Sequence, residues 1–193
     1  MPSDPPFRQD LHIHTTWSHG DGAVAPEQTV ELVAAVRHAE VVGISDHFHF
    51  IADRFGDYAA AVRAAGLRLG TEVDLPQAAE AAACNADYYI AHCFNDPADY
   101  RALETLLATG RPVIVAHPHM LGTDLSRVPP ECLVEINNRY IWRSDWRAYY
   151  QPYAGRFRFV LSSDAHQPNW LAQSVARHVA AELGVTETLL FEP

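Results

Sequence analysis

The chain of 193 residues contains no lysine, because all fourteen of its basic residues are arginines. This absence excludes chemistry that needs a lysine amine, such as Schiff-base catalysis, a P-loop phosphate site or a carbamylated-lysine metal bridge. Cysteine is scarce as well: Cys84, Cys93 and Cys132 are far apart and form no CxxC motif. This spacing indicates reduced thiols rather than a disulfide framework or a zinc ribbon.

Long apolar runs are also missing, since none approaches the roughly 20 residues that span a bilayer. Residues 1–9 form a polar N-terminal segment without the basic-then-apolar order of a secretion signal. We therefore expect a cytoplasmic protein with a single domain over residues 1–193. Acidic residues outnumber basic ones by 24 to 14, and the resulting net charge of −10 disfavours long nucleic acid and anionic membranes as partners. The sequence indicates no protein partner.

Short apolar runs alternate with longer amphipathic segments such as Pro26–Ala39, where proline begins a pattern with a helical period. This alternation predicts an α/β fold, with parallel strands joined by crossover helices. The predicted strands are Leu11–His14, Val41–Ser45, Leu67–Glu72, Tyr88–His92, Pro112–Ala116, Leu133–Asn137 and Arg158–Ser162. So many strands in so short a chain favour a compact α/β barrel, with a doubly wound open sheet as the alternative.

Histidine is abundant, with eleven copies, and most of them stand with carboxylates at the ends of predicted strands. These strand-end residues are His12, His14, Asp46, His47, Glu72, His92, His117, His119, Glu135, Asn137, Asp164 and His166. Since the C-terminal ends of barrel strands form one rim, the side chains should converge there. Such a cluster is costly to bury unless something satisfies it, and metal ions do so.

Two motifs place a pair of ligands on one face of a strand. His12 and His14 are two residues apart, so their side chains project in the same direction, and Asp164 and His166 repeat this spacing. Glu72 ends an apolar strand, at a position that suits a bridging ligand.

Several residues have alternative roles. In the turn SHGDG, either His19 or Asp21 can complete a metal site. His47 is a metal ligand or, with Asp46 to orient it, a general base. We expect His49 and His119 to face the substrate, where either can protonate the leaving group.

The motifs DLHIHTTWSHGDG, GISDH, GTEVD, VAHPH, LVEINN and LSSDAH occur in this order. Together they resemble the PHP (polymerase and histidinol phosphatase) family, over about residues 10–166. The resemblance implies a distorted seven-stranded, TIM-barrel-like (β/α) barrel with two to three divalent ions at the C-terminal strand ends. It also implies hydrolysis of a small phosphomonoester through a metal-bound hydroxide. Imidazole and carboxylate ligands favour Zn, Mn or Fe as the ions.

The resemblance further implies which residues hold each ion. The first site takes His12, His14, Glu72 and Asp164; the second shares Glu72 and adds His92 and His117; the third takes His47, His166 and Asp21, or His19 in place of Asp21. The family usually has its strand-four ligand further along the chain, at the position of Phe94 here.

Phosphate binding is expected from residues just beyond the sixth predicted strand. Asn137, Arg139 and Arg143 are the candidates, since guanidinium groups form bidentate hydrogen bonds with phosphate. Three other functions are open: an amidohydrolase-type C–N hydrolase, a 3′–5′ exonuclease on short oligonucleotides, and a degenerate metal-binding regulatory domain. The lack of lysine counts against the first, the acidic charge against the second, and the largely intact ligand set against the third.

Overall fold

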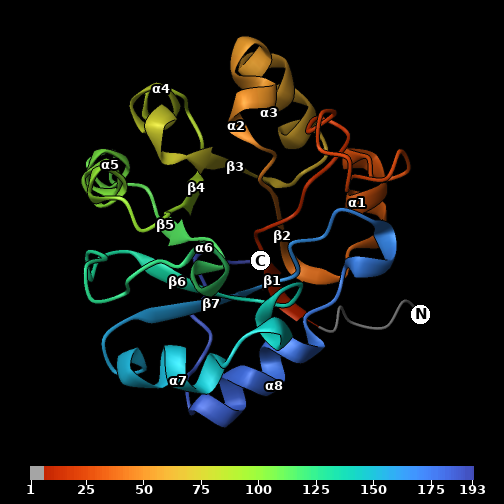
Figure 1. Ribbon diagram of the computed structural model, residues 1–193. Helices are drawn as coiled ribbons and strands as arrows, with labels where there is room; N and C mark the ends of the chain where they lie inside the picture. Colours follow the sequence, from red (N-terminus) through yellow and green to blue (C-terminus); the bar gives the residue numbers. More distant parts are fainter. Residues whose placement is uncertain (1–6) are drawn as a thin grey trace.

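The computed structural model describes residues 7–193, in which seven parallel strands follow one another in chain order around a nearly closed barrel (Figure 1). The strands are β1 (Phe7–Asp10), β2 (Ala39–Ile44), β3 (Arg68–Asp74), β4 (Tyr88–His92), β5 (Val113–Val115), β6 (Leu133–Asn137) and β7 (Arg158–Ser162). The helices are α1 (Val30–Val36), α2 (Phe48–Ile51), α3 (Phe55–Ala64), α4 (Ala78–Ala82), α5 (Pro97–Leu107), α6 (Pro118–Leu121), α7 (Trp146–Tyr150) and α8 (Ser174–Leu183). The predicted seven-stranded, TIM-barrel-like architecture is confirmed.

The barrel closes between β1 and β7 through individual contacts instead of a regular ladder. An isolated parallel bridge joins Ile13 to Ala165. The buried amide of Gln173 donates to the Gln9 carbonyl at 2.8 Å and to the Leu161 carbonyl at 3.0 Å, and so links the two strands. The first and last histidine motifs of the sequence flank this seam, which therefore brings them together.

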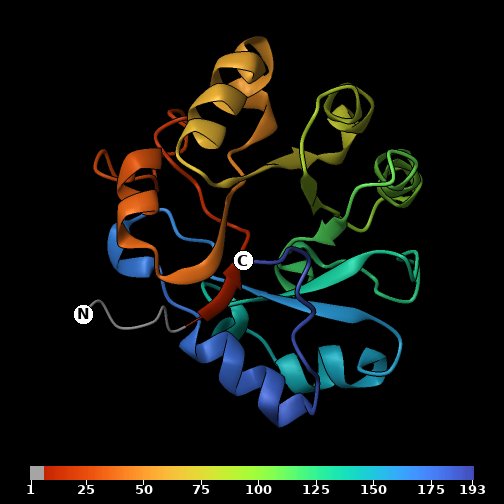
Figure 2. The same ribbon diagram turned by 180° about the vertical axis from the view of Figure 1, so that it is seen from behind.

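Tyr88 fills the interior of the barrel, where it is fully buried and donates to a backbone carbonyl at 2.6 Å. Two glycines make room for it, since a Cβ at Gly43 or Gly70 would lie 2.3 Å from Tyr88 atoms. Glycine at these strand positions therefore follows from close packing. The C-terminal segment crosses the far end of the barrel (Figure 2) and packs Leu190 and Phe191 against the apolar interior.

The first strand lies earlier than the predicted Leu11–His14, since β1 is Phe7–Asp10. Its side chains are too polar to show an apolar pattern. Arg8 binds Glu40 at 2.6 Å, and the buried side chain of Gln9 bonds to the backbone of the C-terminal segment. Residues 7–9 of the predicted polar segment thus belong to the sheet, while residues 1–6 lie outside the described part of the chain.

The helices are short, and α5, with 11 residues, is the longest of them. Helix α1 is shorter than the predicted Pro26–Ala39: it begins after Thr29, whose side chain accepts from the Leu32 N–H, and ends where Arg37 turns left-handed with φ of 44°. Within residues 7–193, no helix has the length and apolar character required to cross a membrane.

Candidate metal centre

The predicted ligands meet in a cavity of about 190 Å³ at the C-terminal ends of the strands. The cavity is lined by His14, Asp21, His47, Glu72, His92, His117, Arg139, Tyr140, Asp164 and His166. His12 is fully buried beside it, with its Nε2 atom 3.0 Å from Nε2 of His14. The structure therefore brings all of the predicted metal ligands into one cluster.

Three groups of possible ligand atoms have all their members within 4.8 Å of one another: His12, His14 and Asp164; Glu72, His92 and His117; His14, His47 and His166. Glu72 connects these groups. Its Oε1 lies 2.6 Å from His92 Nε2 and 3.1 Å from His12 Nε2, and its Oε2 lies 2.9 Å from His47 Nδ1. One carboxylate that faces imidazoles from several strands is suited to bridging metal ions.

Facing ring nitrogens show that the cluster fits cations. Nε2 of His12 lies 3.0 Å from Nε2 of His14, and Nε2 of His92 lies 3.2 Å from Nε2 of His117. Two imidazole nitrogens at this separation need a proton or another cation between or beside their lone pairs. The donor set of imidazole and carboxylate therefore fits one or more ions of the Zn, Mn or Fe type.

The carboxylates make the cluster attractive to positive charge. Burial lowers the pKa of His47 and His92, but Glu72 together with Asp21 at His47 and Asp74 at His92 outweighs burial and raises the two pKa values to about 10 and about 9. Burial likewise raises the pKa of Glu72, yet the surrounding histidines, first of all His92, hold it well below its usual range. His47 and His92 thus take up protons readily, and divalent ions compete for the same ring nitrogens.

Glu135 orients two of the ligands from beneath the cluster, a role that the sequence does not reveal. It is fully buried: Oε1 accepts from His12 Nδ1 at 2.7 Å, and Oε2 accepts from the His117 backbone N–H at 2.7 Å. Burial raises its pKa, but His12, His117 and Asn137 together outweigh burial and hold the pKa at about 2. Asp74 orients His92 in the same way, because its Oδ1 atom lies 2.9 Å from Nδ1 of His92. Such contacts fix the ring tautomer and orientation.

Asp46 fixes the loop after β1 and does not serve as the predicted partner of the His47 ring. Its buried carboxylate accepts from the N–H and hydroxyl of Thr15, both at 2.7 Å, and from those of Ser18, at 3.1 and 2.7 Å. Burial raises its pKa to about 6, although these donors oppose the shift. The sequence shows only an Asp-His pair here, so this role depends on the folded loop.

The same loop carries both alternatives for the third site. Asp21 faces the cluster, with its Oδ2 2.9 Å from His166 Nε2 and 3.4 Å from His47 Nε2. His19 is exposed instead and lies 3.2 Å from the Arg54 guanidinium. Of the two residues, the geometry therefore favours Asp21.

On the fourth strand, the cluster contains His92 and not the residue at position 94. Phe94 is 50% exposed and meets the His92 ring edge-on. Strand β4 ends at His92, so that His92, and not Phe94, lines the cluster cavity.

Two cluster residues have a strained backbone. His117 and Asp164 have φ angles of 23° and 53°, a region that residues other than glycine rarely adopt. Such conformations cost about 1–3 kcal/mol each and persist where surrounding contacts impose them. Here Glu135 accepts from the His117 N–H, and Asn137 Nδ2 donates to Asp164 Oδ2 at 3.1 Å.

Asn137 differs from its predicted role in phosphate binding. It is fully buried; its Nδ2 donates to Glu135 and Asp164, and its Oδ1 accepts from the backbone N–H of Arg139 and of Tyr140. All of its hydrogen-bonding atoms are therefore engaged within the protein. Asn137 positions its neighbours, and the substrate has no access to it.

Arg139 places a guanidinium at the edge of the cluster. Its Nη1 atom lies 3.0 Å from His166 Nδ1 and 3.4 Å from Asp164 Oδ1. The group also lies over the rings of Tyr140 and Trp170, at 4.8 and 5.0 Å from their centroids. These stacked rings hold a positive charge at the cavity mouth.

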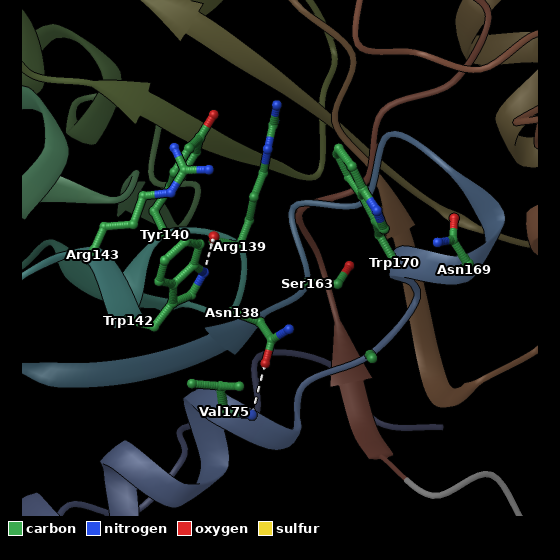
Figure 3. Close-up of a pocket in the computed structure, with 10 residues that line it drawn as sticks. Asn138, Arg139, Tyr140, Trp142, Arg143, Ser163, Asn169, Trp170 and Val175 are labelled. Carbon is green, nitrogen blue, oxygen red and sulfur yellow. Dashed lines mark hydrogen bonds between the residues drawn. The ribbon is translucent and has the colours of Figure 1, made fainter.

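Three other predicted residues lie outside the lining of the cluster cavity. Arg143 stacks on two aromatic rings in a neighbouring cavity (Figure 3). His49 is exposed at the rim, 3.5 Å from Asp74. Nδ1 of His119 lies 3.0 Å from the Tyr150 hydroxyl, so this ring packs below the rim.

Comparison with known proteins supports the fold alone. No protein-family model matches the chain, and no curated protein matches it in sequence. Among solved structures, it is similar to a crystal structure of a sugar phosphate isomerase/epimerase from Parabacteroides distasonis ATCC 8503, with a TM-score of 0.55 and 13% identity. That match covers 96% of this chain and 86% of the other. The match supports the TIM-barrel-like fold, and the buried histidine and carboxylate groups form one or more candidate metal sites within it.

Proposed function

We propose that the protein is a metal-dependent phosphomonoesterase of the PHP type, acting on a small phosphorylated substrate. The observation that carries the proposal is the convergence of three ligand groups around the carboxylate of Glu72. Five of the six motifs that resemble the PHP family supply members of these groups, and His92 adds one more from the end of β4.

Two to three divalent ions fit the cluster. His12, His14, Glu72 and Asp164 would hold one; Glu72, His92 and His117 a second; His47, His166 and Asp21 a third. When bound, such ions activate water as a nucleophile and neutralise the charge of a phosphoryl group.

The chain's own residues orient the substrate. Arg139 can form two parallel hydrogen bonds to phosphoryl oxygens, and its stacking between Tyr140 and Trp170 holds it ready to do so. His49, exposed at the rim, is the candidate for protonating the leaving oxygen. Phosphate binding and proton donation are thus assigned to residues that follow β6 and β2 respectively.

The structural neighbour suggests an alternative, because its name includes a sugar phosphate and an isomerase or epimerase activity. Both activities fit a phosphorylated substrate. They differ in one product: a phosphatase releases inorganic phosphate, whereas an isomerase leaves the ester intact.

The test starts from protein purified without chelators and reconstituted with Zn, Mn or Fe. We expect two to three ions per chain by elemental analysis, and release of phosphate from a panel of monoesters. The variant Asp164→Asn should lower kcat/KM at least about 100-fold, because it removes a charged ligand. His178→Asn, an exposed histidine on α8, is the matched control. A chain that binds no ion, or that converts sugar phosphates without releasing phosphate, would overturn the proposal.

A further inference from the structure

A second cavity, of about 450 Å³, adjoins the metal centre and is shown in Figure 3. Arg139 and Tyr140 line both cavities. One molecule can therefore occupy the second cavity and reach the metal centre past the Arg139 guanidinium. The volume is within the range of cavities that bind small organic ligands.

Aromatic side chains form the sides of this cavity. Trp142 and Trp170 lie on opposite sides of Arg139 (Figure 3). Trp142 is 62% exposed, although its Nε1–H donates to the Arg139 carbonyl at 2.9 Å and fixes the ring. A large, fixed and solvated aromatic face beside a cavity is well suited to stacking with a planar ligand.

Amide side chains supply polar contacts in the same cavity. Asn138 Oδ1 accepts from the backbone N–H of Val175 and Ala176 at 2.9 and 3.1 Å, and thereby caps the start of α8. That helix terminus is therefore occupied and offers no anion site. The Nδ2 of Asn138 is directed away from α8, and Asn169 adds a second amide to the lining (Figure 3). Asparagine amides pair well with the donor and acceptor edge of a nucleobase.

We propose that this cavity binds the base of a nucleoside monophosphate, with the phosphate directed past Arg139 to the metal centre. This inference rests on the proposed function and names its substrate class. The two aromatic faces select a flat ring, and the amides select a ring with polar edges. Arg139 adds positive charge between the base and the metal centre, and Arg143 adds positive charge within the base cavity. Phosphate esters of small flexible alcohols would have no planar ring to stack on these aromatic side chains.

The kinetic test compares adenosine 5′-monophosphate with glycerol 3-phosphate, two monoesters of similar charge. We expect kcat/KM to favour the nucleotide by about tenfold or more, as base stacking on one aromatic side chain contributes this much. Trp142→Ala should lower this preference by about tenfold. Phe94→Ala, which removes another exposed aromatic ring from the rim, should leave the preference unchanged. Equal kcat/KM values for the two esters would overturn the inference.

A binding test separates the inference from the proposed function. Calorimetry with adenosine, which has no phosphate, should detect binding that Trp142→Ala weakens about tenfold. If adenosine binds in this way but no monoester is hydrolysed, the base site stands and the phosphatase proposal fails. If monoesters are hydrolysed but adenosine does not bind, the phosphatase proposal stands and the base site is refuted.

Discussion

The substitution Glu135→Gln tests whether the metal centre depends on the tautomer of His12. In the native protein, Oε1 of Glu135 accepts from His12 Nδ1, and Oε2 accepts from both the His117 N–H and Asn137 Nδ2, at 2.7 and 3.0 Å. A glutamine has one oxygen that can accept, and the two donors at the Oε2 position hold it there. The new amide nitrogen then faces His12.

This arrangement changes the tautomer of the His12 ring. An amide N–H directed at Nδ1 requires Nδ1 to accept, which moves the ring proton to Nε2. Nε2 is the atom that lies 3.0 Å from His14 and 3.1 Å from Glu72, so its lone pair is lost to the cluster. Loss of the group that orients a ligating histidine lowers metal affinity about 10–100-fold. That range corresponds to about 1.4–2.8 kcal/mol.

Competition with a chromophoric chelator measures the affinity directly. We expect the tightest Zn²⁺ or Mn²⁺ affinity of Glu135→Gln to fall within the stated range, and phosphate release to fall with it. The control is Glu187→Gln, which neutralises another largely buried glutamate, bonded to Arg177 at 3.0 Å away from the cluster. Wild-type affinity in a folded Glu135→Gln protein would refute the tautomer argument.

Three further substitutions test other parts of the structure. Asp46→Ala removes the acceptor of four hydrogen bonds from the loop that carries Asp21. Elemental analysis should then find fewer ions per chain. An unchanged ion count would contradict the role of this loop in metal binding. Gly70→Ala places a Cβ 2.3 Å from the Tyr88 ring. Such overpacking costs about 1–3 kcal/mol, so the melting temperature should fall by about 2–12 °C. An unchanged melting temperature would show that the barrel interior rearranges to accommodate the added methyl group. Arg139→Ala should raise KM for phosphomonoesters at least about tenfold with the ion content unchanged, and an unaltered KM would exclude it from phosphate binding.

Most of the barrel could be predicted because its strands are buried on both faces. A strand such as β5, Val113–Val115, then reads as a continuous apolar run between turns. The first strand was predicted too far along the chain, because Arg8 and Gln9 satisfy their polar groups through residues distant in sequence. The contacts that close the barrel could not be predicted for the same reason, since Gln173 bonds to strands at opposite ends of the chain.

The location of the ligands could also be predicted, because every barrel strand directs its C-terminal end to one rim. Their supporting contacts could not. Asn137 and Arg139 are near neighbours after an apolar run, yet one is buried in a hydrogen-bond network and the other reaches the cavity mouth. Likewise, Glu135 and Asp46 have no distinctive spacing, and only the folded backbone shows which donors they satisfy.

The contrast between the cluster and its mouth has a functional consequence. Beneath the ligands, Glu135 and Asn137 engage their polar atoms with the residues that they orient, and the strained backbone of Asp164 is held by one of these bonds. A centre built in this way keeps its geometry whatever the substrate. At the mouth, by contrast, Arg139 stacks on aromatic rings and reaches His166 and Asp164 only with its Nη1 atom, and Trp142 is held by one hydrogen bond to the backbone. Differences in substrate preference should therefore arise from changes at the mouth, while changes beneath the ligands should affect every substrate equally.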